Sequence, residues 1–432
     1  MAMIVIAFQQ CGYAQCPVAP KNCTKNITGN ANQGILLQAR DTLCVSSGAV
    51  FSGAVQKLDT TSLVYIYSGA VFRPSSVDSF KGKIVNCGEM DMPSFNIDFD
   101  STTIENYGLA HFTGTIGTNN PSKWRNGVNA DMIFDNSMTL NSVHFANYGS
   151  VSVKGSLTVN SGMNVISNYD SMMVDGSANI NAKILNEGVI YSKNGTFNVN
   201  ASGPCSNACY FVSGSDFTYS GSDTLFVSGV VLTQATSAAE VKLQGKALVV
   251  SSEGLIEGVG FHNNSTPVLG AGDFIFTGMT VNQGPFGNDK QGLNFYDTTP
   301  TGSQVFDLQS VKPDASVTKK PISPVSNSYV PSLCSSIFKS HSIVTSTTWS
   351  AIDEGDFSVF PNPCTGNVLY FRKISLDAHS VLLRDLNGNK IANVPMEEGK
   401  AQLEISLTKG MYLFEMQDDQ GKSLESGKVI VQ

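Results

Sequence analysis

The stretch that decides the fold is NYGSVSVKGSLTVN, residues 147–160, which recurs as NYDSMMVDGSANIN, residues 168–181. In both copies apolar and polar side chains alternate over short runs, so each run is predicted to be a β-strand with one buried face. An Asn-x-Gly or Asn-x-Asp corner separates the strands, and we expect its glycine to supply a positive φ. One such unit cannot bury its own apolar face, so neighbouring units must stack.

The same unit extends in both directions at a period of ~20 residues. The corner asparagines are Asn86, Asn106, Asn147, Asn168 and Asn186, and a second column holds Asn141, Asn160, Asn181 and Asn200. In register, amide side chains can bond from one unit to the next as a ladder, as in cross-β stacks. The pattern predicts an all-β fold, a β-solenoid. We expect a right-handed parallel β-helix, because crossovers between parallel strands are right-handed.

The repeat also sets the predicted domain boundaries. We expect a β-solenoid over residues 15–283, with about a dozen rungs between Gln33 and roughly Thr280. An irregular cap and linker is expected to follow over 284–356, where prolines stand among many Ser and Thr. The apolar run Ala2–Phe8 is too short to span a membrane but is typical of a signal peptide. Residues 1–14 are therefore predicted to be a signal peptide.

Residues 357–432 follow a different pattern. Short apolar segments alternate with turn signals there, which predicts a small β-sandwich. The segment carries an aromatic-Pro-Asn-Pro start, an Asp-x-x-Gly, a Leu-x-x-Gly-x-Tyr and a late Lys before an apolar strand. In this chain they are Phe360, Pro361, Asn362, Pro363, Asp385, Gly388, Leu407, Gly410, Tyr412 and Lys428.

These marks resemble the type A C-terminal sorting domain of the Bacteroidota type IX secretion system, whose fold is an Ig-like β-sandwich. The resemblance implies export through the periplasm by the type IX secretion machinery. It further implies release from the cell or attachment to the outer-membrane surface. It gives a delivery route and leaves the activity of residues 15–283 open.

Composition and cysteine content bound the environment and partners. Charged residues make up 14% of the chain and the formal net charge is −8, which argues against nucleic acid as a partner. We also expect no membrane span. Nine cysteines in an exported chain favour disulfides. Cys205 and Cys209 could close a local loop, although free thiols and a metal site stay open as alternatives. The connectivity does not follow from the sequence.

Carboxylates are the leading candidates for chemistry. Asp98 and Asp100 alternate with Phe99 on one predicted strand, and Asp91 lies nearby. Paired carboxylates could catalyse hydrolysis or bind calcium, but the same alternation places them on a solvated outward face, which we favour. The five histidines lack metal-ligand spacing. We therefore predict no catalytic residue, no metal and no cofactor.

A tyrosine column is the leading candidate for binding. Tyr107, Tyr148 and Tyr169 each follow a corner asparagine. They could offer flat surfaces to sugar rings, but we favour packing of each ring over the rung below. We predict a cell-surface adhesin or extracellular binding protein for a glycan or cell-surface ligand. The alternatives are a structural subunit that self-assembles through its open sheet edges and a polysaccharide-degrading β-helix enzyme.

Overall fold

The computed structural model consists of short strands joined by tight turns. It describes residues 16–56, 59–77, 80–92, 97–118, 121–160, 164–234, 239–288, 292–297, 299, 304–320, 357–360, 368–373, 379–384, 390–396, 400–404, 410–421 and 423–431. The chain divides into two compact units, Met1–Ser323 and Pro324–Gln432. Every regular element in the described ranges is a β-strand, so the predicted all-β class is confirmed. The predicted signal peptide (1–14) and residues 321–356 of the predicted linker lie outside these ranges.

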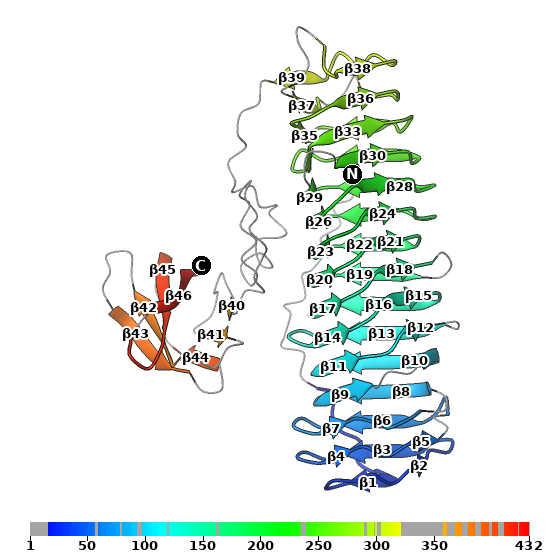
Figure 1. Cartoon of the computed structure of the whole chain (residues 1–432), viewed down its shortest axis with the longest axis vertical. Coiled ribbons are helices and arrows are strands. Elements are labelled where there is room, and N and C mark those ends of the chain that lie inside the picture. Colours follow the sequence, from blue (N-terminus) through cyan, green and yellow to red (C-terminus); the bar gives the residue numbers. More distant parts are fainter. Residues whose placement is uncertain are drawn as a thin grey trace, which may run out of the picture. The chain divides into compact units, whose positions relative to one another are not determined.

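The first unit is a parallel β-solenoid of about 13 turns, as the repeat predicts. Figure 1 shows its rungs stacked from β1 to β39. Its strands form three parallel ladders, called sheets 1, 2 and 3 below. Sheet 1 contains β1 (Lys25–Ile27), β3 (Thr42–Val45), β6 (Leu63–Ile66), β8 (Phe80–Asn86), β10 (Ile97–Asn106), β13 (Ser122–Asn126), β16 (Val143–Asn147), β19 (Val165–Asn168), β22 (Lys183–Asn186), β25 (Cys205–Asn207), β28 (Thr224–Val227), β31 (Ala247–Val250) and β34 (Val268–Gly270).

Sheet 2 contains β4 (Val50–Phe51), β7 (Val71–Phe72), β9 (Glu89–Met92), β11 (Leu109–Phe112), β14 (Asp131–Phe134), β17 (Ser150–Val153), β20 (Ser171–Val174), β23 (Val189–Ser192), β26 (Tyr210–Ser213), β29 (Val230–Thr233), β32 (Leu255–Gly258), β35 (Asp273–Phe276), β37 (Asn294–Asp297) and β39 (Thr318–Lys320). Sheet 3 contains β12 (Ile116–Gly117), β15 (Met138–Leu140), β18 (Leu157–Val159), β21 (Ala178–Ile180), β24 (Phe197–Val199), β27 (Phe217–Tyr219), β30 (Glu240–Leu243), β33 (Gly260–Asn263), β36 (Thr280–Asn282) and β38 (Leu308–Gln309). The short strands β2 (Ile35–Leu36) and β5 (Val55–Gln56) pair with each other.

The core is built by in-register stacking of equivalent side chains. In β17 the side chains of Val151 and Val153 are buried, while those between them are not. Val151 pairs with Met132 in the preceding rung and with Met172 in the following one. Each fully buried apolar side chain contributes ~1.5–3 kcal/mol. A single rung has too few of them, so the fold is stable only as a stack.

The corner glycines serve close packing rather than an unusual backbone conformation. Gly149 and Gly188 are not among the described residues with positive φ, so the expectation of positive φ at these corners is wrong. A Cβ added at Gly149 would lie 2.3 Å from the Ala130 carbonyl oxygen, and one at Gly188 would lie 2.0 Å from that of Asp170. Glycine is required there because adjacent corners approach too closely for a side chain.

The solenoid continues beyond the boundary expected at residue 283. Strand β37 pairs in register with β35 on one side and β39 on the other, so the stack reaches Lys320. Alternating burial persists in β37, and Phe286, Phe295 and Phe306 are all fully buried. The boundary was placed too early because the Asn-x-Gly corner disappears there while the apolar core continues.

The second unit has two antiparallel sheets, as predicted for a small sandwich. One holds β40 (Phe357–Phe360), β41 (Val368–Lys373) and β44 (Lys400–Glu404). The other holds β42 (Ser380–Arg384), β43 (Lys390–Pro395), β45 (Gly410–Gln417) and β46 (Ser423–Val431). Leu403 of the first sheet and Val381, Tyr412 and Phe414 of the second belong to one hydrophobic cluster. The two sheets therefore share one core.

Candidate functional site

A continuous ladder of buried asparagines runs along the inside of the solenoid. The corner asparagines are fully buried, and the side-chain amide of each donates to Oδ1 of the next. The donor–acceptor distances are Asn86–Asn106 2.7 Å, Asn106–Asn126 2.8 Å, Asn126–Asn147 3.0 Å, Asn147–Asn168 2.8 Å, Asn168–Asn186 2.8 Å and Asn186–Asn207 2.7 Å. The ladder thus includes Asn207. The Asn-x-Gly pattern does not predict this residue, because its corner contains no glycine.

The second asparagine column is less continuous. The amide of Asn160 donates to Oδ1 of Asn141 at 2.6 Å. Asn181 and Asn200 join through backbone bonds, because their N–H groups donate to the carbonyls of Val159 and Ile180 respectively. The corner column is structural, because its side chains hold the rungs in register and are engaged with one another. Among the described residues, Asn141 and Asn160 are the pair of the second column that forms the predicted side-chain ladder, since Asn181 is half-buried and Asn200 is exposed.

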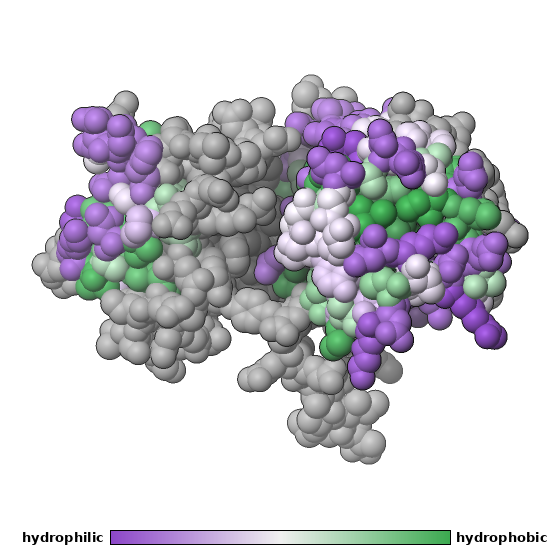
Figure 2. All heavy atoms as spheres, turned by 90° about the horizontal axis from the view of Figure 1, so that it is seen from below, coloured by the Kyte–Doolittle hydropathy of each residue, from purple (hydrophilic) through white to green (hydrophobic). Residues whose placement is uncertain are grey.

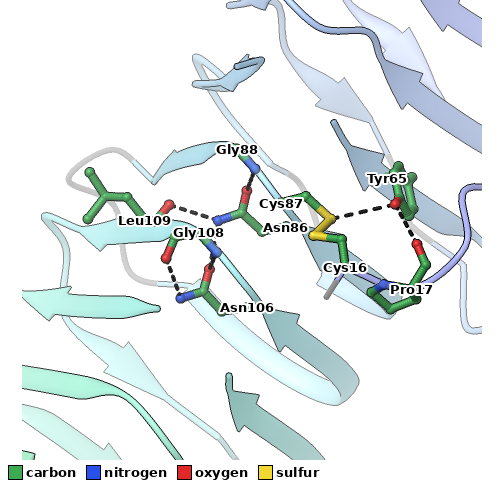
Figure 3. The surroundings of a disulfide bond; sticks show 9 residues. All are labelled: Cys16, Pro17, Tyr65, Asn86, Cys87, Gly88, Asn106, Gly108 and Leu109. Atoms are coloured by element: carbon green, nitrogen blue, oxygen red, sulfur yellow. Dashed lines mark hydrogen bonds between the residues drawn. A yellow bond between two sulfur atoms is a disulfide. The ribbon is translucent and has the colours of Figure 1, made fainter. Parts of the chain in front are cut away.

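An N-terminal strap is fastened to the outer face of sheet 1 by two disulfides, Cys16–Cys87 and Cys23–Cys44. The strap spans residues 16–24. Figure 3 shows the hydroxyl of Tyr65 directed at the Pro17 carbonyl, to which it donates at 2.7 Å. Beneath the strap Tyr65 is only 4% exposed, although its place in the strand directs it outward. The strap therefore covers an outward apolar column.

The local disulfide considered for Cys205 and Cys209 does not form. Cys205 is a free, buried thiol, and Cys209 is disulfide-bonded elsewhere. The strand explains the difference, because alternation in β25 directs Cys205 into the core, where it is 2% exposed. Burial raises the pKa of the Cys205 thiol to about 11. This cysteine is therefore a core residue and a poor nucleophile.

The predicted tyrosine column stacks along the solenoid axis. The rings of Tyr148 and Tyr169 are nearly parallel, at 9°, with centroids 4.7 Å apart. The guanidinium of Arg125 lies over the rings of both Tyr107 and Tyr148, with Cζ 5.9 Å and 5.1 Å from their centroids. Ring faces are thus turned toward one another and toward Arg125, so they cannot serve as a flat platform for sugars. Packing over the neighbouring rung, the favoured interpretation, fits this geometry.

Arg125 occupies a gap in the column that sequence patterns do not reveal. The tyrosine position of its rung is filled by Gly127, where an added Cβ would lie 2.9 Å from Cδ1 of Tyr107. The arginine side chain comes from two residues earlier and fills the space between the rings. A planar guanidinium suits such a stack and gains cation–π attraction from both rings.

A line of paired polar side chains crosses sheet 2. Nε of Arg73 donates to Asp91 at 2.5 Å, and its Nη2 lies 3.2 Å from a Glu89 carboxylate oxygen. His111 lies between two carboxylates, with Nδ1 3.3 Å from Asp91 and Nε2 2.8 Å from Asp135. Asp91, a candidate for acid or base chemistry, is therefore already paired on two sides. Such exposed pairs contribute ~0–1 kcal/mol each.

The other candidate carboxylates add little to a site. Asp98 and Asp100 lie in β10, but their side chains fall outside the described part of the structure. Among the residues that are described, no group of three or more His, Cys, Asp or Glu side chains is arranged to hold a metal ion. The same residues contain no helix long and apolar enough to cross a membrane.

The sorting marks are partly described. Gly410 and Tyr412 lie in β45 and Lys428 lies in β46, with Tyr412 buried in the sandwich core. Pro361, Asn362, Pro363, Asp385, Gly388 and Leu407 fall outside the described residues. Tyr412 thus has a packing role that follows from its strand.

Comparison with known proteins identifies the second unit. Residues 358–432 match the family model described as a secretion system C-terminal sorting domain. No curated protein and no solved structure matches the chain. The sorting tail implies interaction with the type IX secretion machinery and export to the cell surface or the extracellular space.

Proposed function

We propose that this chain is a cell-surface adhesin or extracellular binding protein of a Bacteroidota bacterium, exported with a signal peptide and its sorting domain. The observation that carries the proposal is that a sorting domain occurs in one chain with a solenoid whose buried corner asparagines are engaged in stacking. The asparagine ladder uses amide donors and acceptors internally, so ligands must be met by outward side chains. Long repeat surfaces suit extended ligands.

Catalysis is the weaker alternative, and we propose that the chain is not an enzyme. Asp91 is held by Arg73 and His111, so its lone pairs are already engaged. A polysaccharide panel incubated with the purified full-length protein tests this. We expect neither new reducing ends nor unsaturated products, and either product would reverse the proposal.

A filament or layer subunit is the second candidate function. Seen from the β1 end, hydrophobic surface lies among hydrophilic residues (Figure 2), and Leu36 of β2 is 43% exposed. An open end of this kind favours stacking. Against it, β1 carries Lys25 and β39 carries Lys319 and Lys320. Lysines on edge strands oppose strand pairing, and like charges at both ends oppose head-to-tail contact.

Electron microscopy and adhesion assays separate these functions. Rods ~60 Å long are expected for single solenoids, from ~4.8 Å per rung; continuous filaments would support the subunit instead. Attachment of a deletion strain to a panel of glycan-coated and cell-coated surfaces is then compared with that of the complemented strain. We expect deletion to abolish attachment to at least one surface. Equal attachment on every surface would refute the adhesin proposal.

A further inference from the structure

The outward face of sheet 1 changes character along the solenoid. In β13 the burial alternates, with Trp124 inside and Lys123 and Arg125 exposed. Lys123 lies in register with His144 of β16 in the next rung, and His144 is also exposed. Three side chains able to carry positive charge therefore meet on two adjacent rungs.

Arg125 is held in place yet lacks an anionic partner within the described residues. Its contacts there are the two cation–π contacts with Tyr107 and Tyr148. The carboxylate in the preceding rung, Glu105, pairs instead with Lys83 at 2.7 Å. The N–H groups of a guanidinium lie in its plane, so a guanidinium over ring faces still has donors for an incoming anion. We call this arrangement, in which Arg125 lies over the rings of Tyr107 and Tyr148, the Arg125 clamp. Because it already holds the arginine side chain in place, binding would cost less conformational entropy.

The charge of β13 is opposite to that of the whole chain. The formal net charge is −8, whereas the exposed charged side chains of β13 are Lys123 and Arg125. A local positive patch on an acidic protein attracts anions and orients them toward the patch. Two oxygens of a planar carboxylate, or two oxygens of a tetrahedral sulfate group, can accept from the fork of N–H groups of arginine.

We propose that Lys123, Arg125 and His144, together with the hydroxyl groups of Tyr107, Tyr148 and Tyr169, form a binding surface for an acidic polysaccharide that bears uronate or sulfate groups. The inference rests on the proposed binding function and names its ligand class. The surface follows the solenoid axis over the rungs of β10, β13, β16 and β19. An extended polymer can therefore contact successive rungs.

Two features favour a polysaccharide over an acidic protein. Protein interfaces depend on buried aromatic or apolar anchors, but the facing rings of Tyr148 and Tyr169 are occupied by each other. The three tyrosines of the column are half-buried, so a ligand would contact their ring edges and hydroxyls rather than their faces. Burial raises the pKa of the Tyr107 and Tyr169 hydroxyls, so both remain protonated donors at neutral pH. Hydroxyl donors beside a fixed arginine suit a sugar chain.

Affinity gel electrophoresis of the full-length protein tests the surface. The gels contain polygalacturonate, chondroitin sulfate, neutral pullulan or poly-glutamate at matched concentrations. We expect retardation by an acidic polysaccharide, weakened by salt, and none by pullulan. The variants are Arg125→Gln, Arg125→Lys and Lys123→Gln. The matched control is Lys193→Gln, which removes one exposed positive charge just after β23 on another face.

Arg125→Gln should weaken binding about tenfold, the loss expected for one charge-assisted bidentate contact. Arg125→Lys should bind more weakly than the unmodified protein and more tightly than Arg125→Gln, because lysine keeps the charge but lacks the forked N–H donors of arginine. Lys193→Gln should bind like the unmodified protein. Equal binding by Arg125→Gln and Lys193→Gln would overturn the proposal, as would no binding to either acidic polysaccharide. Equal retardation by poly-glutamate would assign the surface to acidic proteins instead.

Two controls keep the result interpretable. The unfolding midpoint of Arg125→Gln is compared with that of the unmodified protein, and Lys123→Gln, which is outside the clamp, provides a second test if folding suffers. Attachment of cells that display Arg125→Gln separates this inference from the proposed function. Normal attachment by that strain, with loss in the deletion strain, would refute the acidic-polysaccharide surface and leave the adhesin proposal standing.

Discussion

The side-chain amide of Asn147 donates to Oδ1 of Asn168 at 2.8 Å, and both side chains are fully buried. The same Nδ2 also donates to the Ser171 carbonyl at 2.9 Å, and Oδ1 of Asn147 accepts from the Gly149 N–H at 3.2 Å. One side chain therefore joins two rungs and closes its own corner. Such a network fixes the register of the stack.

Asn147→Ala should destabilise the solenoid by roughly 1–3 kcal/mol, because it leaves buried partners in both adjacent rungs unsatisfied. Asn168→Ala should have a similar effect for the same reason. Urea or thermal unfolding, followed by circular dichroism, measures the shift. Asn200→Ala is the control, since Asn200 is exposed. Unchanged midpoints for both buried variants would show that the ladder does not support the fold.

Asp170 should make the solenoid more stable in acid than at neutral pH. Burial, and then the charge of Asp131, raises the pKa of Asp170 from 3.8 to about 7, and its Oδ1 is buried without a hydrogen-bond partner. The raised pKa means that the folded state holds this proton more tightly than the unfolded chain. Its stabilising contribution is therefore complete below about pH 4 and lost as the pH rises through about 7, on the order of 2–4 kcal/mol.

Asp170→Gly should remove that pH dependence, since neighbouring corners carry Gly149 and Gly188 at this position. Unfolding midpoints measured from pH 4 to pH 8 test it, with the exposed Glu187→Gln as control. If the unmodified protein and Asp170→Gly show the same pH profile, Asp170 does not titrate in this range.

Much of the fold could be predicted from the sequence because its physical signals are local and periodic. The Asn-x-Gly corners give the rung length, and alternation around Val151 gives the buried face. The Arg125 clamp could not be predicted, because it depends on a missing tyrosine at Gly127 and on an arginine two residues earlier. Only the stacked rungs bring Tyr107 and Tyr148 to either side of Arg125.

Cysteine pairing shows the same limit. Alternation within β25 is local, and it explains why Cys205 faces the core. The Cys16–Cys87 disulfide joins residues 71 apart in sequence, so its formation depends on the path of the strap across sheet 1. No spacing pattern carries that information, because loop closure depends only weakly on length.

The thiol of Cys205 should be inert in the folded protein. Its pKa is raised to about 11 by burial, so almost no thiolate exists at pH 8, and the side chain is 2% exposed. Thiol titration of the unmodified protein and of Cys205→Ala should agree under native conditions. In denaturant the variant should have one reactive thiol fewer. A native difference of one thiol would contradict the buried placement.

Loss of Cys16–Cys87, one of the two disulfides that fasten the strap, should destabilise the β1 end of the solenoid. Replacing Cys16 and Cys87 together by serine should cost roughly 2–5 kcal/mol and expose Tyr65, whose hydroxyl now donates to Pro17. Limited proteolysis should then cut the strap, residues 16–24, before the rungs. Cys205→Ala, which removes no cross-link, should leave the strap resistant. Equal resistance in the double-serine variant would show that the strap is held without Cys16–Cys87.

Removal of residues 357–432 should strand the solenoid in the periplasm. The sorting match covers 358–432, and the two units have separate cores, so the truncated solenoid should still fold. Tyr412→Ala is a milder change, because it removes one buried aromatic ring from the sandwich. It should lower the free energy of unfolding of the sandwich by roughly 3–5 kcal/mol, as for other buried aromatic residues. Surface display should fall, while the solenoid should be unchanged. Protease shaving of intact cells with immunodetection measures display. Met411→Ala, at the neighbouring position of β45, serves as the matched control. Normal display of the truncated chain would show that residues 357–432 are not needed for export and would contradict their sorting role.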